Sequence, residues 1–287
     1  MADSPLKGFA RSRISDLSEQ LIQDLQRTAM KQDEEAVHKM RVSIRRFVQG
    51  LSVFKRQVPH NKSRKALKQL RPVLQRSSKV RDLDLAILFL KKHRRDAGEL
   101  ASRREQAGEK LAKAVSYDEW KMRLHWGGAA DCVANPGIVR AIVQKKLPPI
   151  TADFFAAGRK AIKPGRTWHE MHKFRLAAKE FRYTLELFRP LFGPELEQRL
   201  EAVKKIQEYL GDINDAVSAR KLLKKLDDTD SLREKLAQKA QARRAELISY
   251  WQGEFDAPGE LVKWKTYSQP VAARAKKTVQ QKVRARA

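Results

Sequence analysis

The stretch HKMRVSIRRFVQGLSVF (residues 38–54) has a close counterpart in HKFRLAAKEFRYTLELF (residues 172–188), at a constant offset of 134 residues. In both stretches a His-Lys-x-Arg opening is followed by basic and apolar residues at matching distances. A second pair of segments, from Leu70 to Asp82 and from Val203 to Asp215, matches at an offset of 133. Two matching blocks at nearly the same offset are improbable by coincidence. The sequence therefore predicts an internal duplication of a unit of about 130 residues.

The whole chain has the pattern of an all-α protein. Gly and Pro are scarce, with 13 and 11 in 287 residues, and apolar residues recur at three- and four-residue spacing. Asp33 is the expected N-cap of the second helix, and Glu34 and Glu35 follow it in the first turn. The predicted helices span about 12–31, 34–57, 61–77, 83–95, 99–124, 152–162, 168–187, 195–210, 213–226 and 231–255.

Helix breakers gather near the middle of the chain, at Gly127-Gly128, Pro136-Gly137, Pro148-Pro149 and Pro164-Gly165. They predict a first half of about 12–126, a linker of about 127–151 and a second half of about 152–255. Residues 261–287 hold eight Lys or Arg and no Asp or Glu, which indicates a basic C-terminal tail. We therefore expect two antiparallel helical bundles related by a pseudo-twofold axis, followed by this tail.

Each repeated helix carries two stripes when its residues are placed about 100° apart around the axis. The apolar stripe comprises Met40, Ile44, Phe47, Leu51 and Phe54 in the first copy, and Met171, Phe174, Ala178, Phe181, Leu185 and Phe188 in the second. A basic stripe lies roughly 110° around the helix in the same sense in both copies. We name its members the first basic row (His38, Arg41 and Arg45) and the second basic row (His172, Arg175, Lys179 and Arg182). Packing by the apolar stripes would allow twofold symmetry to bring both rows to one groove.

The composition favours a polyanionic partner. Lys plus Arg number 61 against 34 Asp plus Glu, which gives a net charge of +27. Such a chain attracts nucleic acid, acidic membranes or phosphate polymers. The single cysteine, Cys132, excludes an intramolecular disulfide and Cys-rich zinc modules. The apolar run from Leu83 to Leu90 is far too short to cross a membrane, and the N-terminus lacks the apolar core of a secretory signal, so we expect a cytoplasmic protein without membrane contact.

The spacing of each basic row points to an anion. Side chains three or four residues apart on a helix lie about 5 to 6 Å apart at Cβ, so their repulsion is costly unless a negative group lies between them. Arg pairs two oxygens of one phosphate, and His adds a pH-sensitive donor. A linear phosphate polymer fits a row of this kind. The alternative for any one of these residues is a solvated helix face, and for Asp82 and Asp215 it is a helix cap or an ion pair with a row Arg, which leaves Arg81 ambiguous.

Other motifs do not support a catalytic or metal site. His169-Glu170-x-His172 has its histidines at i, i+3 rather than the i, i+4 of a zinc protease, so we reject it and expect no metal and no cofactor. There is no Gly-rich phosphate loop or nucleophile elbow. The five Trp residues are spread singly, which favours packing over base stacking.

The paired His-x-x-Arg helices, together with Val80-Arg81-Asp82-Leu83-Asp84 and Leu210-Gly211-Asp212-Ile213-Asn214-Asp215, resemble the CHAD (conserved histidine α-helical domain) family. The resemblance covers about residues 12–255. It implies two helical bundles that bind inorganic polyphosphate in a basic groove between them. Our leading hypothesis adds that the protein is targeted to polyphosphate granules. The polyphosphate-binding residues that the resemblance implies are His38, Arg41, Arg45, Arg46, Arg71, Arg81, His172, Arg175, Lys179, Arg182 and Lys204.

The sequence departs from the family pattern in two places. Glu180 stands at the position of Arg46 in the other half. Ser78 stands where the second half has Gly211, so the helix boundary expected at this position is less sharply defined in the first half. Family members are often fused to a triphosphate-tunnel catalytic domain. No Glu-x-Glu-x-Lys opening precedes Ser12, so the resemblance implies a stand-alone binding module.

Three functions remain open from the sequence. The leading one is non-catalytic binding of long-chain polyphosphate. The alternative is sequence-independent nucleic-acid binding, for which the basic residues from Lys263 to Arg286 would suffice. The third is an enzyme, either a polyphosphate hydrolase or a carrier phosphorylated on His38 or His172, although phosphoryl transfer needs a carboxylate cluster that the sequence does not display. The sequence does not determine the oligomeric state.

Overall fold

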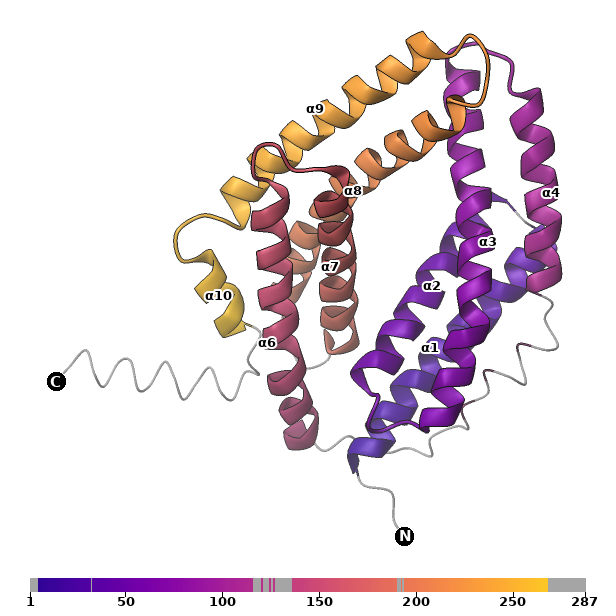
Figure 1. Cartoon of the computed structure of the whole chain (residues 1–287). Helices are drawn as coiled ribbons and strands as arrows, with labels where there is room; N and C mark the ends of the chain where they lie inside the picture. Colours follow the sequence, from indigo (N-terminus) through magenta and orange to yellow (C-terminus); the bar gives the residue numbers. More distant parts are fainter. Residues whose placement is uncertain are drawn as a thin grey trace. The chain divides into compact units, whose positions relative to one another are not determined.

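The computed structural model describes residues 5–31, 33–115, 120, 124, 126, 136–189, 192 and 194–267. These residues form helices joined by short turns, and no strand occurs among them. The helices are α1 (Pro5–Lys31), α2 (Glu34–Val53), α3 (His60–Lys92), α4 (Gly98–Ala114), α6 (Pro136–Ala161), α7 (Trp168–Leu187), α8 (Glu195–Leu223), α9 (Asp230–Glu254) and α10 (Glu260–Tyr267), as Figure 1 shows. The predicted all-α class is confirmed.

The chain divides into two compact units that do not follow the predicted halves. The first comprises Met1–Val133 and Asp215–Ala240, and the second comprises Ala134–Asn214 and Gln241–Ala287. The division therefore falls inside α8 and again inside α9. Residues 215–240, expected in the second half, belong to the first unit.

In the first unit, successive helices pack side by side, α1 on α2, α2 on α3 and α3 on α4 (Figure 1). The predicted apolar stripe of α2 is fully buried, with Met40, Ile44 and Phe47 all at 0% exposure. Polar contacts add specific ties between helices. The buried carboxylate of Asp24 on α1 accepts a hydrogen bond from Ser43 Oγ on α2. Arg104 Nε of α4 donates to Asp84 Oδ1 of α3 at 2.8 Å.

In the second unit, α6 packs on α7 around a cluster of aromatic rings (Figure 1). Phe154 of α6 stacks on Phe181 of α7 with ring centroids 4.7 Å apart. Trp251 of α9 meets Phe174 of α7 edge to face at 5.0 Å. Aromatic pairs of this geometry contribute about 0.5 to 1.5 kcal/mol beyond the burial of their area. The predicted packing role of Trp251 is confirmed, since its side chain is fully buried.

Two predicted breaks between helices are absent. The helices expected at 61–77 and 83–95 form one continuous α3, and those expected at 195–210 and 213–226 form one continuous α8. Asp82 and Asp215 therefore lie within helices and do not cap them, and Ser78 marks no boundary. The physical reason is burial: Val73, Ser77 and Val80 keep the helical spacing of buried positions through the expected break.

The predicted linker at 127–151 is also partly wrong. Residues 136–151 belong to α6, which contains Pro148 and Pro149 in its interior, while 127–135 lie outside the described residues. A proline inside a helix costs about 3 kcal/mol. Burial of Val143, Leu147 and Phe154 on the same helix offsets that cost, because all three are at 0% exposure.

The helix ends differ in smaller ways. α1 begins at Pro5 rather than Ser12, and α2 ends at Val53 rather than near Gln57. α4 ends at Ala114, and the rest of the helix predicted to reach Leu124 lies mostly outside the described residues. The start of the predicted basic tail is helical, because α10 buries Trp264 and Tyr267. Residues 268–287 of that tail lie outside the described residues.

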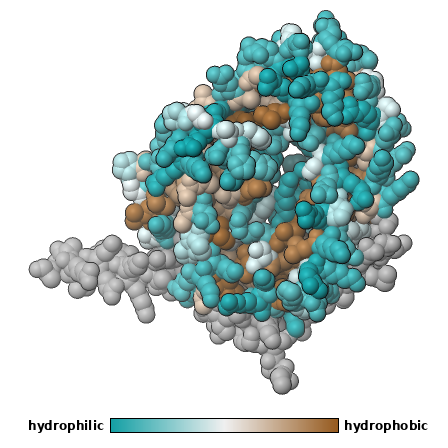
Figure 2. Space-filling view, viewed as in Figure 1, coloured by the Kyte–Doolittle hydropathy of each residue, from teal (hydrophilic) through white to brown (hydrophobic). Residues whose placement is uncertain are grey.

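Hydrophilic residues cover most of the face shown in Figure 2, and apolar residues form separate patches on it. Within the described part of the chain, no helix combines the length and the hydropathy needed to cross a bilayer.

Gly158 allows α6 to lie close to Trp251 of α9. A Cβ at this position would lie 2.2 to 2.5 Å from atoms of the buried Trp251 ring. Gly158→Ala should therefore lower the free energy of unfolding by roughly 1 to 3 kcal/mol or more. Gly253→Ala is the matched control: its Cβ would meet nothing within 4 Å, so it should stabilise α9 by up to about 1 kcal/mol. Urea unfolding of both variants checks this, and equal effects would contradict the close contact.

Candidate functional site

The first basic row lies on α2, which starts with a formed cap. Asp33 Oδ1 accepts a hydrogen bond from Ala36 N at 2.7 Å, as the sequence predicts. Burial of the apolar stripe leaves the row beside the core. His38 is exposed, and Arg41 and Arg45 are half-buried. The row thus flanks the core of the first unit without entering it.

Arg41 has a second role that the sequence does not predict. Its Nη1 donates to Ser77 Oγ at 2.9 Å and to Ser78 Oγ at 2.8 Å, and it also reaches the carbonyl of Leu74 at 3.3 Å. All three acceptors lie on α3. Hydrogen bonds that involve a charged group contribute about 1.5 to 3 kcal/mol each. Arg41 therefore helps to hold α2 against α3 as well as standing in the basic row.

Arg81 reaches the first basic row from α3. Its guanidinium pairs with Glu34 in the first turn of α2, and its Nη2 lies 3.8 Å from Asp215 Oδ2. Asp215 is expected from the sequence to cap a helix or to pair with a row Arg; the ion pair that it forms here is with Arg81, which belongs to neither row. Arg81 is not on the repeated helix, yet its charge acts directly on His38.

The pKa of His38 is lowered from its ordinary value. Partial desolvation is the largest cause, and the positive charges of Arg81, Arg41 and Arg45 add to it, while Glu34 acts in the opposite direction. An imidazole among three guanidinium groups resists taking up a proton. The first basic row is therefore a place of positive potential with a largely neutral histidine at pH 7.

The second basic row lies on α7. His172 is half-buried, and its ring centroid lies 6.2 Å from that of Trp168 one turn earlier. Burial lowers the pKa of His172, and the charges of Arg175, Lys179 and His169 lower it further. The charges of Arg175 and Lys179, both members of the second row, thus act on the ring of His172.

Arg182 differs from the rest of the second row. Its Nε lies 3.1 Å from Glu186 Oε1 on the same helix, and its guanidinium lies over the ring of Tyr183 at 5.4 Å. Its charge is therefore partly neutralised by the protein itself.

Three further candidates lie away from the histidines. Arg46 is half-buried on α2, Arg71 is exposed on α3, and Lys204 is exposed on α8, where it pairs with Glu201 at 3.1 Å. None of them is among the charges that shift the pKa of His38 or His172. The structure does not gather these three around either histidine.

Sequence reasoning missed Glu34, Ser77 and Ser78 as parts of the site. A comparison of the two copies contains a signal for the two serines, because they are polar where the second copy has no side-chain hydroxyl. Leu210 and Gly211 stand where the first copy has Ser77 and Ser78, so the hydroxyl pair that accepts from Arg41 is specific to the first copy. The sequence marks Glu34 only by its place in the first turn of the helix, where a carboxylate complements the helix dipole.

Within the described ranges, no group of three or more His, Cys, Asp or Glu side chains could hold a metal ion. Each row by itself presents groups that can bind anions by charge and by hydrogen bonds from guanidinium and ammonium groups.

The family model that matches this chain is that of the CHAD domain, over residues 13–224. The chain belongs to the CHAD family. The match includes both basic rows and the helices that carry them, so the resemblance seen in the sequence is confirmed. The predicted pseudo-twofold duplication within this CHAD domain stays a prediction.

Among solved structures, the CHAD domain from the plant Ricinus communis is similar to this one, with a TM-score of 0.62 and 20% sequence identity over 94% of each chain. At this identity the likeness shows a shared fold. No curated protein sequence matches the chain.

The pKa of His38 tests the position of Arg81. Arg81→Met removes a charge that opposes protonation of His38, so we expect the pKa of His38 to rise and that of His172 to stay unchanged. Arg71→Met is the control, because it removes one charge from the same helix away from His38. NMR titration of the histidine ring protons measures both. A His38 pKa that responds equally to the two substitutions would contradict the arrangement.

Proposed function

We propose that this CHAD domain binds long-chain inorganic polyphosphate on its two basic rows and accompanies granules of that polymer, without chemical turnover. The observation that carries the proposal is the crowding of like charges around two histidines. His38 stands among Arg41, Arg45 and Arg81, and His172 stands beside Arg175 and Lys179. A polymer that repeats one negative group at short intervals relieves repulsion along each row.

The spacing of the rows supports a phosphate polymer. Successive row residues are three or four positions apart on one helix, so their Cβ atoms lie about 5 to 6 Å apart. Each guanidinium can pair with two oxygens of a phosphate group, and a lysine follows the chain as a mobile point charge. Neighbouring cations can thus engage phosphates of one chain without reading any base.

Sequence-independent RNA binding is the second candidate, and one observation favours it. Trp168 is half-exposed beside His172, where an unpaired base could stack on it. Stacking of a base on an aromatic side chain contributes about 1 to 3 kcal/mol. Against this stands the first basic row, where the position of Trp168 is taken by Glu34.

Absence of turnover is part of the proposal. Phosphoryl transfer is generally driven by divalent metal held on carboxylates. Incubation with labelled polyphosphate and magnesium, followed by measurement of released phosphate and of phosphohistidine, tests this point. Formation of either product faster than in the protein-free control would contradict the absence of turnover and would show that the protein is an enzyme.

Arg175 is the residue with which to test polyphosphate binding. Arg41 is unsuitable by itself, because its loss would also disturb the packing of α2 on α3. We expect Arg175→Ala to weaken polyphosphate binding roughly tenfold or more. The slope of the logarithm of the binding constant against the logarithm of the salt concentration should fall in magnitude by about one. Lys173→Ala is the matched control, since Lys173 is an exposed cation on the same helix outside the row.

Competition completes this experiment. Single-stranded RNA and duplex DNA are added to the polyphosphate complex at equal phosphate concentration. The proposal requires that polyphosphate remain bound and that Arg175→Ala weaken it more than Lys173→Ala does. Displacement by RNA at equal concentration would favour the second candidate.

The affinity for polyphosphate should rise as the pH falls from 7 toward 6. The pKa values of His38 and His172 are lowered in the free protein, so both rings are largely neutral at pH 7. A bound phosphate favours the charged ring and raises both pKa values, so binding takes up protons. Calorimetry in buffers of different ionisation enthalpy measures the uptake. The double variant His38→Gln with His172→Gln should lose it, and unchanged uptake in that variant would contradict the role of the histidines.

Glu34 should compete with the ligand for Arg81. Its carboxylate already pairs with that guanidinium, so a phosphate on the first basic row must displace it. We expect Glu34→Gln to tighten polyphosphate binding several-fold. Glu35→Gln has the same change of net charge in the same turn, but Glu35 pairs with Lys39 outside the row, at 2.6 Å. Equal affinities of the two variants would show that only net charge matters.

A further inference from the structure

A cavity of about 400 Å³ in the first unit is distinct from the basic rows and has a different chemistry. Its walls come from the C-terminal part of α3 and from the parts of α8 and α9 that belong to this unit. Sites for small molecules usually enclose about 300 to 1,000 Å³, with apolar walls and a few convergent polar groups. The cavity meets that description.

One part of the lining, which we call the floor, is apolar and accessible. Leu85, Leu88 and Phe89 lie at i, i+3 and i+4 on one face of α3, and Ala216 and Leu236 face them from α8 and α9. Leu88 is 59% exposed, and Phe89 is half-buried. An exposed leucine beside an accessible aromatic ring offers a surface on which a flat ring system can stack.

A second part of the lining, which we call the rim, consists of exposed lysines. Lys92 of α3 and Lys235 and Lys239 of α9 line it, and none of these three ammonium groups forms an ion pair with a described residue. The one acidic residue of the lining, Asp215, is already close to Arg81 at 3.8 Å. A ligand that is anionic at one end and apolar at the other would complement these three cations and the apolar floor.

His93 adds a directional polar group to the wall. Its Nδ1 lies 2.9 Å from the carbonyl oxygen of Phe89, and its ring centroid lies 4.3 Å from that of Phe89. A carbonyl oxygen only accepts, so the neutral ring carries its proton on Nδ1 and leaves Nε2 as an acceptor. Nε2 is thus suited to an amino group of the ligand.

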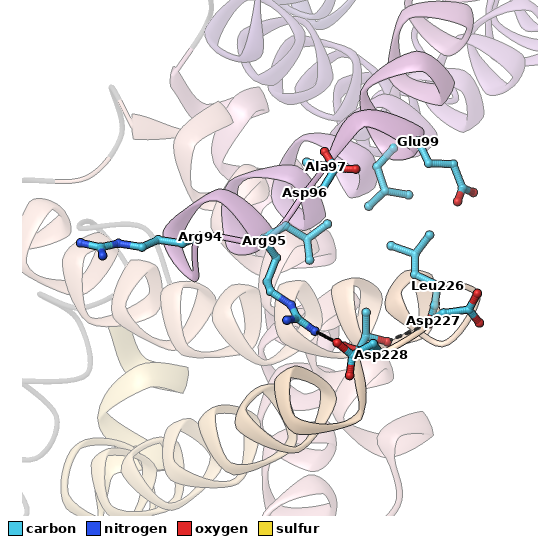
Figure 3. A pocket seen from close by; sticks show the side chains of 11 residues that line it. Arg94, Arg95, Asp96, Ala97, Glu99, Leu226, Asp227 and Asp228 are labelled. Atoms are coloured by element: carbon cyan, nitrogen blue, oxygen red, sulfur yellow. Dashed lines mark hydrogen bonds and ion pairs between the residues drawn. The ribbon is translucent and has the colours of Figure 1, made fainter.

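A second cavity of the first unit has the opposite character. It measures about 410 Å³ and lies between the turn after α3 and the turn after α8. Figure 3 shows Arg95 reaching across it to Asp228, with which it forms an ion pair. Asp96, Glu99 and Asp227 also line it, so carboxylates outnumber cations and the Arg95 charge is taken up internally. Nothing there indicates a ligand.

We propose that the cavity between α3, α8 and α9 binds a purine nucleoside di- or triphosphate, with the base over Leu88 and Phe89 and the phosphates on Lys92, Lys235 and Lys239. The base supplies the flat ring, its amino group faces His93 Nε2, and the phosphates neutralise the rim. This site is independent of the proposed binding of polyphosphate on the basic rows.

Calorimetry with the full chain tests the proposal, with ATP, ADP, adenosine and tripolyphosphate as probes at one salt concentration. ATP should bind tighter than both adenosine and tripolyphosphate, because only ATP engages the floor and the rim together. The double variant Lys235→Ala with Lys239→Ala should weaken ATP binding at least tenfold. Leu88→Gln, at an exposed position that does not threaten folding, should weaken it several-fold.

Two controls separate this site from the basic rows. Lys224→Ala with Lys225→Ala removes the same charge from exposed positions after α8 and should leave ATP affinity unchanged. Arg175→Ala should also leave it unchanged, whether or not that variant loses polyphosphate. No ATP binding, ATP binding no tighter than that of tripolyphosphate, or equal effects of the two double lysine variants would each overturn the proposal. Binding of an acidic helical peptide here with no binding of ATP would overturn it as well.

Discussion

Burial of the apolar stripes of α2 and α7 is the constraint on which the rest of the site depends. Burial of Met40, Ile44 and Phe47 in the core fixes the rotation of α2 about its own axis, and with it the directions in which its other faces point. The cations one stripe away are therefore held at fixed neighbouring positions, where long flexible side chains would otherwise spread apart. Hydrophobic packing, which has no preference for any ligand, thus supplies the order that an anion-binding surface needs.

The two copies of the repeated helix meet this constraint with different polar contacts. In the first copy, Arg41 is tied to the hydroxyls of Ser77 and Ser78, and Arg81 is held by Glu34. In the second, Gln207 of α8 donates to the carbonyl of Ala178 of α7 at 2.7 Å, so an uncharged side chain makes the tie between the two helices. The two rows are therefore similar in sequence, but the polar contacts described for the helices that carry them differ.

Periodicity predicted the helices and both rows, because spacing along a helix determines which residues share a face. It failed where a local signal was outweighed by distant contacts. Pro148 and Pro149 read as breakers, but packing of α6 keeps them within the helix. Contacts such as Arg81 with Glu34 join residues 47 positions apart, and no local pattern encodes them. The chain order also gave no sign that residues 215–240 join the first unit.

The concentration of like charge around His38 gives ionic strength two opposite effects on this domain. Dissolved ions screen the mutual repulsion of Arg41, Arg45 and Arg81, so added salt favours the folded state of the free protein. The same ions compete for any polyanion and weaken its binding. A high salt concentration therefore favours folding of the free domain, whereas a low one favours the proposed complex, in which the polyanion would neutralise the cations in place of dissolved ions.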